Sequence, residues 1–237
     1  MTSIGFGDPR TEHGELLWPE RYGPKEIEEA KRSLGSYAAA GQLQQRPSPA
    51  EGGMIKRHWF RFWQAPGANL PPVVVRFPDG SERSIVAEEI GRVEEPAQSW
   101  DCSFKDLETS DYVVGQVWGR LGSNFLLLDQ VRDRMDCPTT VKAVQLMSTR
   151  WRGCAAKLIE DKANGSAVIQ MLANQITGIL PVNPSGGKVA RASAISPLIE
   201  AGNVYLPHPQ MFPWVTDFIE ENAPRFRTAR MMTRSMR

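Results

Sequence analysis

Apolar residues follow two different patterns along the chain, and the change falls near Trp100. Beyond this point, apolar runs of strand length come first and then alternate with segments whose apolar residues have helical spacing. The predicted strands are QSWDCSF (98–104), DYVVGQVWGR (111–120), NFLLLDQVR (124–132), AAKLIED (155–161) and TGILPV (177–182). The predicted helices are PTTVKAVQLMSTRW (138–151), GSAVIQMLANQI (165–176), VARASAISPLIEAG (189–202) and FPWVTDFIEEN (212–222).

The order of these elements predicts the fold class. Three strands precede the first helix, and strands alternate with helices afterwards. A meander that leads into strand–helix–strand crossovers predicts an α/β domain of about 130 residues, with a mixed sheet and helices on its faces. This is the order of elements in ribonuclease H-like folds.

The first part of the chain has a different pattern of apolar and polar residues. PKEIEEAKRSLGSYAAAGQLQQ (24–45) predicts a helix that begins at Pro24 and is interrupted at Gly35. PPVVVRFPDGSERSIV (71–86) predicts a β-hairpin with its turn at Pro78, Asp79 and Gly80. We therefore expect a mainly helical adaptor with a hairpin over residues 1–96, and the α/β domain over residues 97–223.

The segment MIKRHWFRFWQ (54–64) mixes aromatic and basic residues. Lys56, Arg57 and Arg61 together with the aromatic rings could grip a nucleic-acid strand by charge and stacking. Burial of Trp59, Phe60 and Trp63 in the core is the favoured alternative, because aromatic side chains usually bury themselves.

Composition and charge narrow the class of protein. The 237 residues carry a net charge of +1 and are 41% hydrophobic, which suits a globular domain with an accessory segment. No apolar run reaches the length of a membrane span and no secretory signal is present, so we expect a cytoplasmic protein. Cys102, Cys137 and Cys154 are an odd number at wide spacing, which predicts reduced packing residues rather than disulfides or a zinc site.

Several acids fall at strand positions. Asp101 lies inside an apolar strand, Asp111 begins the next strand, and Glu160 and Asp161 end the strand 155–161. A carboxylate in a strand is costly to bury unless it is paired or binds a cation. Carboxylates that converge from neighbouring strands would suit Mg²⁺ or Mn²⁺, and two such ions can activate a water against a phosphodiester. In the alternative interpretation, Asp101 caps a bend and the Glu160–Asp161 pair is a solvated strand end.

Three basic residues are candidates for contact with DNA. Lys188 and Arg191 follow a flexible turn and open a predicted helix, so they either contact phosphate or are a solvated helix start. Lys162 follows Glu160 closely enough to meet a phosphate or to balance the carboxylates.

Several ordered motifs carry a resemblance to a known family. They are LWPERYGPKEIEEAKRSLGSYAAAGQLQQRPSPAEGGMIKRHWFRFW, SWDCSFKDLETSDYVVGQVWGR, LLLDQVRDRMDCPTTVKAV, LIEDKANGSAVIQML and KVARASAISPLIEAGNVYLP. Over residues 17–221 the chain resembles the large terminase subunit of tailed bacteriophages, from the end of the ATPase through the nuclease domain.

This resemblance implies a function and a site. The implied function is cleavage of concatemeric double-stranded viral DNA during genome packaging, by a ribonuclease H-like domain with two Mg²⁺ or Mn²⁺ ions. Asp101 matches the first metal-binding aspartate, Glu160 the second acidic ligand, and Asp111 a further acid near the site. The implied partners are double-stranded DNA, the portal and the small terminase subunit, in the cytoplasm of a bacterial host. No G-x-x-x-x-G-K-[ST] motif is present, so we expect no ATP binding by this chain.

The chain departs from the family pattern at its end. The family continues with a stretch of the form FPNGxHDDxVDA, which supplies a third acidic ligand, whereas residues 224–237 are basic and contain no acid. Met231-Met232-Thr233 must be encoded as ATG ATG ACN, which contains GAT GAC, or Asp-Asp, in another frame. In that frame permitted codons give FPNGAHDDEVDA.

We therefore expect a frameshift, from a sequencing error, a decayed prophage gene or a programmed event, and a disordered tail. A chain without the third ligand would be a weakened endonuclease or, alternatively, a catalytically silent prophage remnant that only binds DNA or packaging partners.

Overall fold

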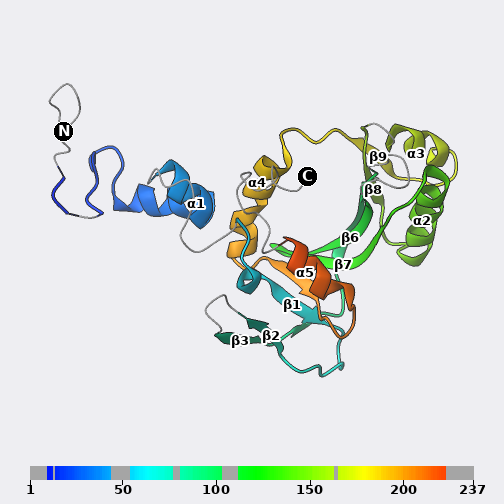
Figure 1. Cartoon of the computed structure of the whole chain (residues 1–237), viewed down its shortest axis with the longest axis horizontal. Coiled ribbons are helices and arrows are strands. Elements are labelled where there is room, and N and C mark those ends of the chain that lie inside the picture. Colours follow the sequence, from blue (N-terminus) through cyan, green and yellow to red (C-terminus); the bar gives the residue numbers. More distant parts are fainter. Residues whose placement is uncertain are drawn as a thin grey trace, which may run out of the picture.

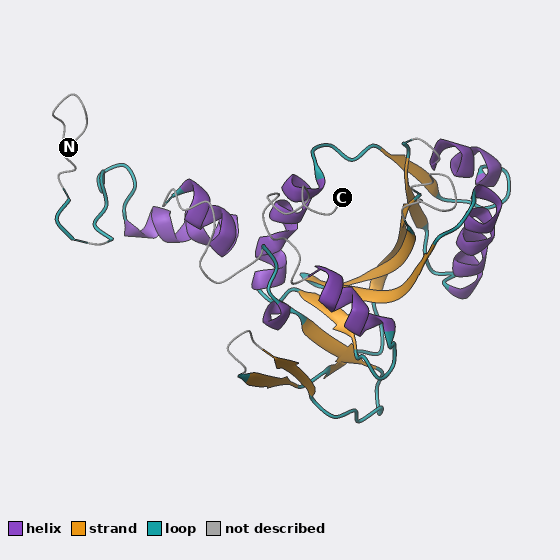
Figure 2. Cartoon of the chain, in the orientation of Figure 1, coloured by secondary structure: helices purple, strands orange, loops and turns teal. Residues whose placement is uncertain are grey.

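The main feature of the computed structural model is one eight-stranded mixed sheet (Figure 2). The structure describes residues 10–12, 14–43, 54–76, 81–102, 112–162 and 165–222. The strand order is β4-β1-β10-β7-β6-β5-β8-β9. The strands of the sheet are β1 (Arg61–Gln64), β4 (Glu88–Glu89), β5 (Glu94–Asp101), β6 (Val113–Leu121), β7 (Asn124–Asp133), β8 (Ala156–Glu160), β9 (Ile179–Val182) and β10 (Val204–Pro207).

The pairing directions reproduce the predicted order. β5, β6 and β7 form an antiparallel meander, and β8 and β9 add in parallel beside β5. On the other side, β10 and β1 add in parallel beside β7, and β4 completes the edge. The predicted α/β class with a ribonuclease H-like mixed sheet is confirmed.

Helices lie on both faces of the sheet (Figure 1). They are α2 (Cys137–Arg150), α3 (Gly165–Leu172), α4 (Lys188–Glu200) and α5 (Trp214–Asn222). α1 (Pro24–Gln42) lies away from the sheet and packs against α4, and a short 3-10 turn spans Arg57–Trp59. α2 and α3 pack beside β6 and β8, whereas α4 and α5 lie on the side of β1. Among the described residues, no helix combines the length and apolar character that a bilayer span requires.

One core lies between the sheet and the helices α2 and α3, on what we call the α2/α3 face. Trp100, Val117 and Ile159 point into it from alternate strand positions, and each is at most 2% exposed. Val144 of α2 and Leu172 of α3 are fully buried against them. α2 begins where it does because Asp136 is a good N-cap: its Oδ1 accepts a hydrogen bond from the Thr139 N–H at 2.8 Å.

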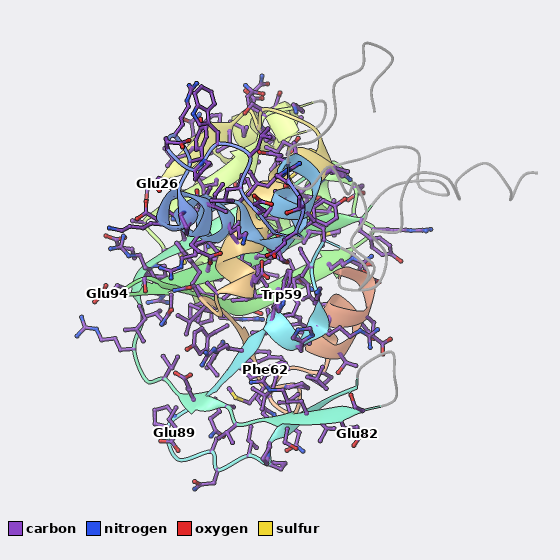
Figure 3. All side chains as sticks on the ribbon, turned by 90° about the vertical axis from the view of Figure 1, so that its left-hand side faces the viewer. Glu26, Trp59, Phe62, Glu82, Glu89 and Glu94 are labelled. Atoms are coloured by element: carbon purple, nitrogen blue, oxygen red, sulfur yellow. The ribbon has the colours of Figure 1, made fainter. Side chains whose placement is uncertain are left out.

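A second core lies on the opposite face of the sheet, under α4 and α5. Phe62 and Leu206 from the strands pack there with Ile199 of α4 and Val215 of α5. Trp59 also contributes to this core; Figure 3 shows Trp59 and Phe62 in the middle of the view, with Glu26, Glu82, Glu89 and Glu94 around the outside.

The aromatic residues of segment 54–64 are buried, so the core interpretation of this segment is confirmed. Trp59, Phe60 and Trp63 are 9%, 3% and 8% exposed. The indole N–H of Trp63 also donates a hydrogen bond of 2.9 Å to the carbonyl of Leu127 in β7.

The N-terminal part agrees with the predicted elements and adds two strands. β2 (Val73–Arg76) pairs antiparallel with β3 (Glu82–Ile85), as the hairpin prediction requires, although its turn lies outside the described residues. α1 is interrupted at Gly35, where φ is 70°. β1 and β4 join the same sheet as β5 to β9, and the domain boundary near residue 97 stays a prediction.

Candidate functional site

Asp101 and Glu160 lie side by side at the carboxyl ends of β5 and β8. These strands are parallel neighbours with Trp100 opposite Ile159, so Asp101 and Glu160 occupy the next positions of the same register. Paired strands are about 4.8 Å apart, and directly opposite residues point to the same face. Because Trp100 and Ile159 point into the α2/α3 core, both carboxylates point to the other face of the sheet.

A tight turn from β8 into α3 fixes the position of Glu160. A β-carbon on Gly165 would lie 1.8 Å from the carbonyl oxygen of Glu160, so only glycine fits at the start of α3. The Gly165 N–H donates to the Lys162 carbonyl at 3.0 Å, and the Ser166 hydroxyl donates to Asp161 Oδ1. Asp161 therefore accepts a hydrogen bond within the turn. The Glu160 side chain points to the face of the sheet that it shares with Asp101.

The electrostatic surroundings of the pair are mixed. The Glu160 side chain is 21% exposed, and Lys162 Nζ lies 3.6 Å from its Oε1 and 3.2 Å from the Pro184 carbonyl, to which it donates. Burial raises the pKa of the neighbouring Cys102 thiol to about 12, and the negative charge of Asp101 contributes to this rise in pKa. Of the three predicted DNA-contacting residues, Lys162 is the one that lies beside the acidic pair, because its Nζ is 3.6 Å from Glu160 Oε1.

The donor set fits a hard cation, but only two of its predicted members lie in the described part of the chain. Carboxylate oxygens are the ligands that Mg²⁺ and Mn²⁺ prefer, and Asp101 and Glu160 present them from adjacent strand ends. Asp111 lies outside the described residues. Within the described ranges, no group of three or more His, Cys, Asp or Glu side chains is placed to hold an ion.

Lys188 and Arg191 are not brought to the acidic pair by any described contact. They begin α4, which Figure 1 shows apart from β8 and β9, joined to β9 by the segment 183–187. Lys188 is exposed and Arg191 is half-buried. The role of Lys188 and Arg191 in DNA contact stays a prediction.

Sequence reasoning missed a basic and aromatic cluster at the same sheet edge. The Arg132 guanidinium lies 3.8 Å from the ring centroid of Tyr112, and the Arg134 guanidinium lies 5.4 Å from it. A signal was present in the V-R-D-R end of the strand 124–132, where two arginines stand two positions apart and so share a face. The register with Tyr112 was not visible in the sequence.

A further strand acid was also missed, and it lies on the α2/α3 face. Asp129 of β7 is 4% exposed, and its Oδ2 accepts hydrogen bonds of 2.8 Å from Arg150 and from the Trp151 indole. These partners lie at the end of α2, so Asp129 fastens this helix to the sheet.

Comparisons with known proteins agree with this arrangement. A family model described as the terminase RNaseH-like domain matches residues 98–223, which is more than half of the chain. No curated protein sequence matches the chain.

Three solved structures illustrate the range of similar chains. The large terminase of a thermophilic bacteriophage, in complex with ADP, is 7% identical with a TM-score of 0.52, over 82% of this chain and 44% of that one. The large terminase nuclease of thermophilic phage G20c with bound magnesium is 17% identical with a TM-score of 0.45, over 69% of this chain and 78% of that one. The nuclease domain of the bacteriophage SPP1 large terminase with bound manganese is 13% identical with a TM-score of 0.41, over 54% of this chain and 69% of that one. With the match over residues 98–223, the chain belongs to the terminase RNaseH-like domain family.

Proposed function

We propose that this chain is a divalent-metal-dependent endonuclease that cuts double-stranded DNA, and that Asp101 and Glu160 hold the metal. The observation that carries the proposal is the register of β5 and β8, which sets two carboxylates at adjacent strand ends on one face. Membership of the terminase family supports DNA as the substrate.

The residues present fit the chemistry of such a site. When bound, one or two Mg²⁺ or Mn²⁺ ions would activate water and stabilise the leaving oxygen of a phosphodiester. Asp101 and Glu160 would hold the ions, and Asp111 would assist. Lys162, close to Glu160, would balance the carboxylates or meet a phosphate of the bound strand.

The biological role that we propose is cleavage of concatemeric viral DNA during genome packaging in a bacterial host. The portal and the small terminase subunit would be its partners in this process. Lys188 and Arg191 would contact DNA phosphates away from the acidic pair. These assignments follow from the family resemblance and do not depend on the metal site.

Nicking of a supercoiled plasmid in Mn²⁺ tests the proposed activity. We expect the full chain to nick and Asp101→Asn and Glu160→Gln to lose nicking by at least about 100-fold, because each removes a metal ligand. Asp217→Asn and Glu94→Gln are matched controls, since both acids are exposed and lie on α5 and at the far end of β5. Equal loss in the controls, or nicking that survives Asp101→Asn, would contradict the site.

A silent DNA-binding remnant is the second candidate, and one observation favours it. The stretch that supplies the third acidic ligand in the family has no counterpart in residues 224–237, which contain no acid. Retention of DNA in EDTA, together with no nicking in either Mg²⁺ or Mn²⁺, would support this candidate over the enzyme.

A further inference from the structure

The acidic pair belongs to a row of residues that crosses five strands. Asp101 is opposite Val114 in β6, and Val114 is opposite Arg132 in β7. On the other side, Glu160 is opposite Val182 in β9. Directly opposite residues share a face, so Arg132 points to the same side of the sheet as the two carboxylates.

Two further residues extend this row into a cluster. Tyr112 lies two positions before Val114 and is 41% exposed, and the Arg132 guanidinium stacks on its ring at 3.8 Å. The Arg134 guanidinium lies 5.4 Å from the centroid of the same ring. We call Tyr112, Arg132 and Arg134 the Tyr112 cluster.

The two arginines of the Tyr112 cluster have different surroundings. Arg132 forms a two-point ion pair with Glu221 of α5, at 3.1 Å and 3.0 Å, so its charge is balanced and its position over Tyr112 is fixed. Arg134 is exposed, and no ion pair joins its side chain to a carboxylate of any described residue. Arg134 therefore presents a positive charge beside an exposed aromatic ring.

We propose that the Tyr112 cluster is a DNA-binding site in which Arg134 contacts the phosphate backbone and Tyr112, held by Arg132, supports the Arg134 guanidinium. The proposal rests on the proposed function, because it uses the acidic pair as the place of cutting. DNA would cross this face of the sheet from the end of β7 to the end of β8. Arginine on an aromatic ring keeps its donors available for phosphate oxygens.

The spacing suits a DNA strand. Arg132 and Asp101 are two strand spacings apart, or about 10 Å between their backbones. One strand of a duplex rises about 3.4 Å per nucleotide along the helix axis, so this span corresponds to about three nucleotides. Arg134 would thus hold a phosphate a few nucleotides from the one that is cut.

Binding of a labelled DNA duplex to the full chain in EDTA, followed by fluorescence anisotropy at several salt concentrations, tests this site. We expect Arg134→Ala to weaken binding by about 5-fold and to lower the salt slope by about 1, as for the loss of one phosphate contact. Arg134→Lys should keep the slope, because the charge remains. Tyr112→Ala should weaken binding and Tyr112→Phe should not, because the ring is the support.

Arg152→Ala is the matched control, because Arg152 is an exposed arginine just after α2, at the end of the sheet where β8 begins. The proposal is overturned if Arg134→Ala and Arg152→Ala bind DNA with the same affinity and the same salt slope. This result would leave the metal site intact, since plasmid nicking by Asp101→Asn is measured separately. Conversely, weaker binding by Arg134→Ala with no metal-dependent nicking by the unaltered chain would support the DNA site and contradict the proposed enzyme.

Discussion

Two groups of acids in the sheet have different surroundings. Asp129 lies within β7 on the α2/α3 face, whereas Asp101 and Glu160 lie at strand ends on the opposite face. The oxygens of Asp129 accept hydrogen bonds from Arg150, from the Trp151 indole and from the backbone of the next residue. Glu160 instead has a lysine at 3.6 Å and a neighbouring carboxylate.

This difference separates a structural acid from a candidate ligand. A buried carboxylate whose oxygens are held by several donors joins elements of the fold and is poorly placed to bind an ion. Two carboxylates in register at an open strand end repel each other and gain from a shared cation. The comparison predicts that changes at Asp129 act on stability and changes at the strand ends act on metal binding and cutting.

Among the acids, the largest loss of stability is expected at Asp129. Asp129→Ala should lower the free energy of unfolding by about 3 kcal/mol, because it removes an ion pair and leaves the Trp151 N–H without its acceptor. Urea denaturation followed by circular dichroism measures the change. Asp217→Ala, at an exposed position of α5, is the control and should change stability by less than about 0.5 kcal/mol. Equal small changes in both variants would contradict the structural role of Asp129.

A smaller effect is expected where α3 begins. Gly165→Ala should cost about 2 kcal/mol and also reduce nicking, because its β-carbon collides with the Glu160 carbonyl and must displace the strand end. Gly187→Ala is the matched control, since no atom lies within 4 Å of the position that its β-carbon would occupy. Thermal unfolding and plasmid nicking are measured on both. If Gly165→Ala nicks as well as Gly187→Ala does, the position of Glu160 is not critical.

The third prediction concerns the acidic stretch that the family resemblance implies at the end of the chain. Replacing residues 224–237, which lie outside the described part of the chain, with FPNGAHDDEVDA should raise nicking in Mn²⁺ by at least about 10-fold, because the added carboxylates supply a missing ligand. The matched control carries FPNGAHNNEVDA, in which both aspartates are asparagines. Equal nicking by all three chains, at matched protein and salt concentrations, would show that the residues before 224 suffice.

The smallest effect on stability is expected at Leu158, an apolar residue on the same face of the sheet as Glu160. Leu158 is 36% exposed and lies two positions before Glu160, so Leu158→Gln should change stability by less than about 0.5 kcal/mol. Leu172→Ala, on the α2/α3 face where the side chain is fully buried, should cost about 2 to 5 kcal/mol. Chemical denaturation compares the two variants. A large loss of stability in Leu158→Gln would show that this face is covered.

Much of the fold was predictable because its signals are local. Alternating apolar residues and turns located β5 to β9, and helical spacing located α2 to α5. The expectation that Asp101 and Glu160 converge rested on strand placement together with the family resemblance, and the pairing of β8 beside β5 places them in one register. Boundaries were less well defined: β5 begins at Glu94, four residues before the prediction, beyond an irregularity where Glu95 has a φ of 47°.

The remaining features depend on contacts between distant segments. β1 and β10 were not predicted, because they form by pairing with each other, with β4 and with β7, which lie elsewhere in the sequence. The Tyr112 cluster and the partners of Asp129 depend on register and helix placement, which a single sequence does not encode locally. The roles of Asp101, Asp111 and Glu160 stay predictions until metal binding is measured.

Calorimetric titration of the folded chain with Mn²⁺ tests the central claim most directly. The account predicts that the unaltered chain binds Mn²⁺ and that Asp101→Asn and Glu160→Gln each lower the affinity by at least about 10-fold. Asp129→Asn, titrated under conditions where it is folded, should bind Mn²⁺ as the unaltered chain does. Equal Mn²⁺ affinity in all four chains, or loss only in Asp129→Asn, would contradict the assignment of the metal to the paired strand ends.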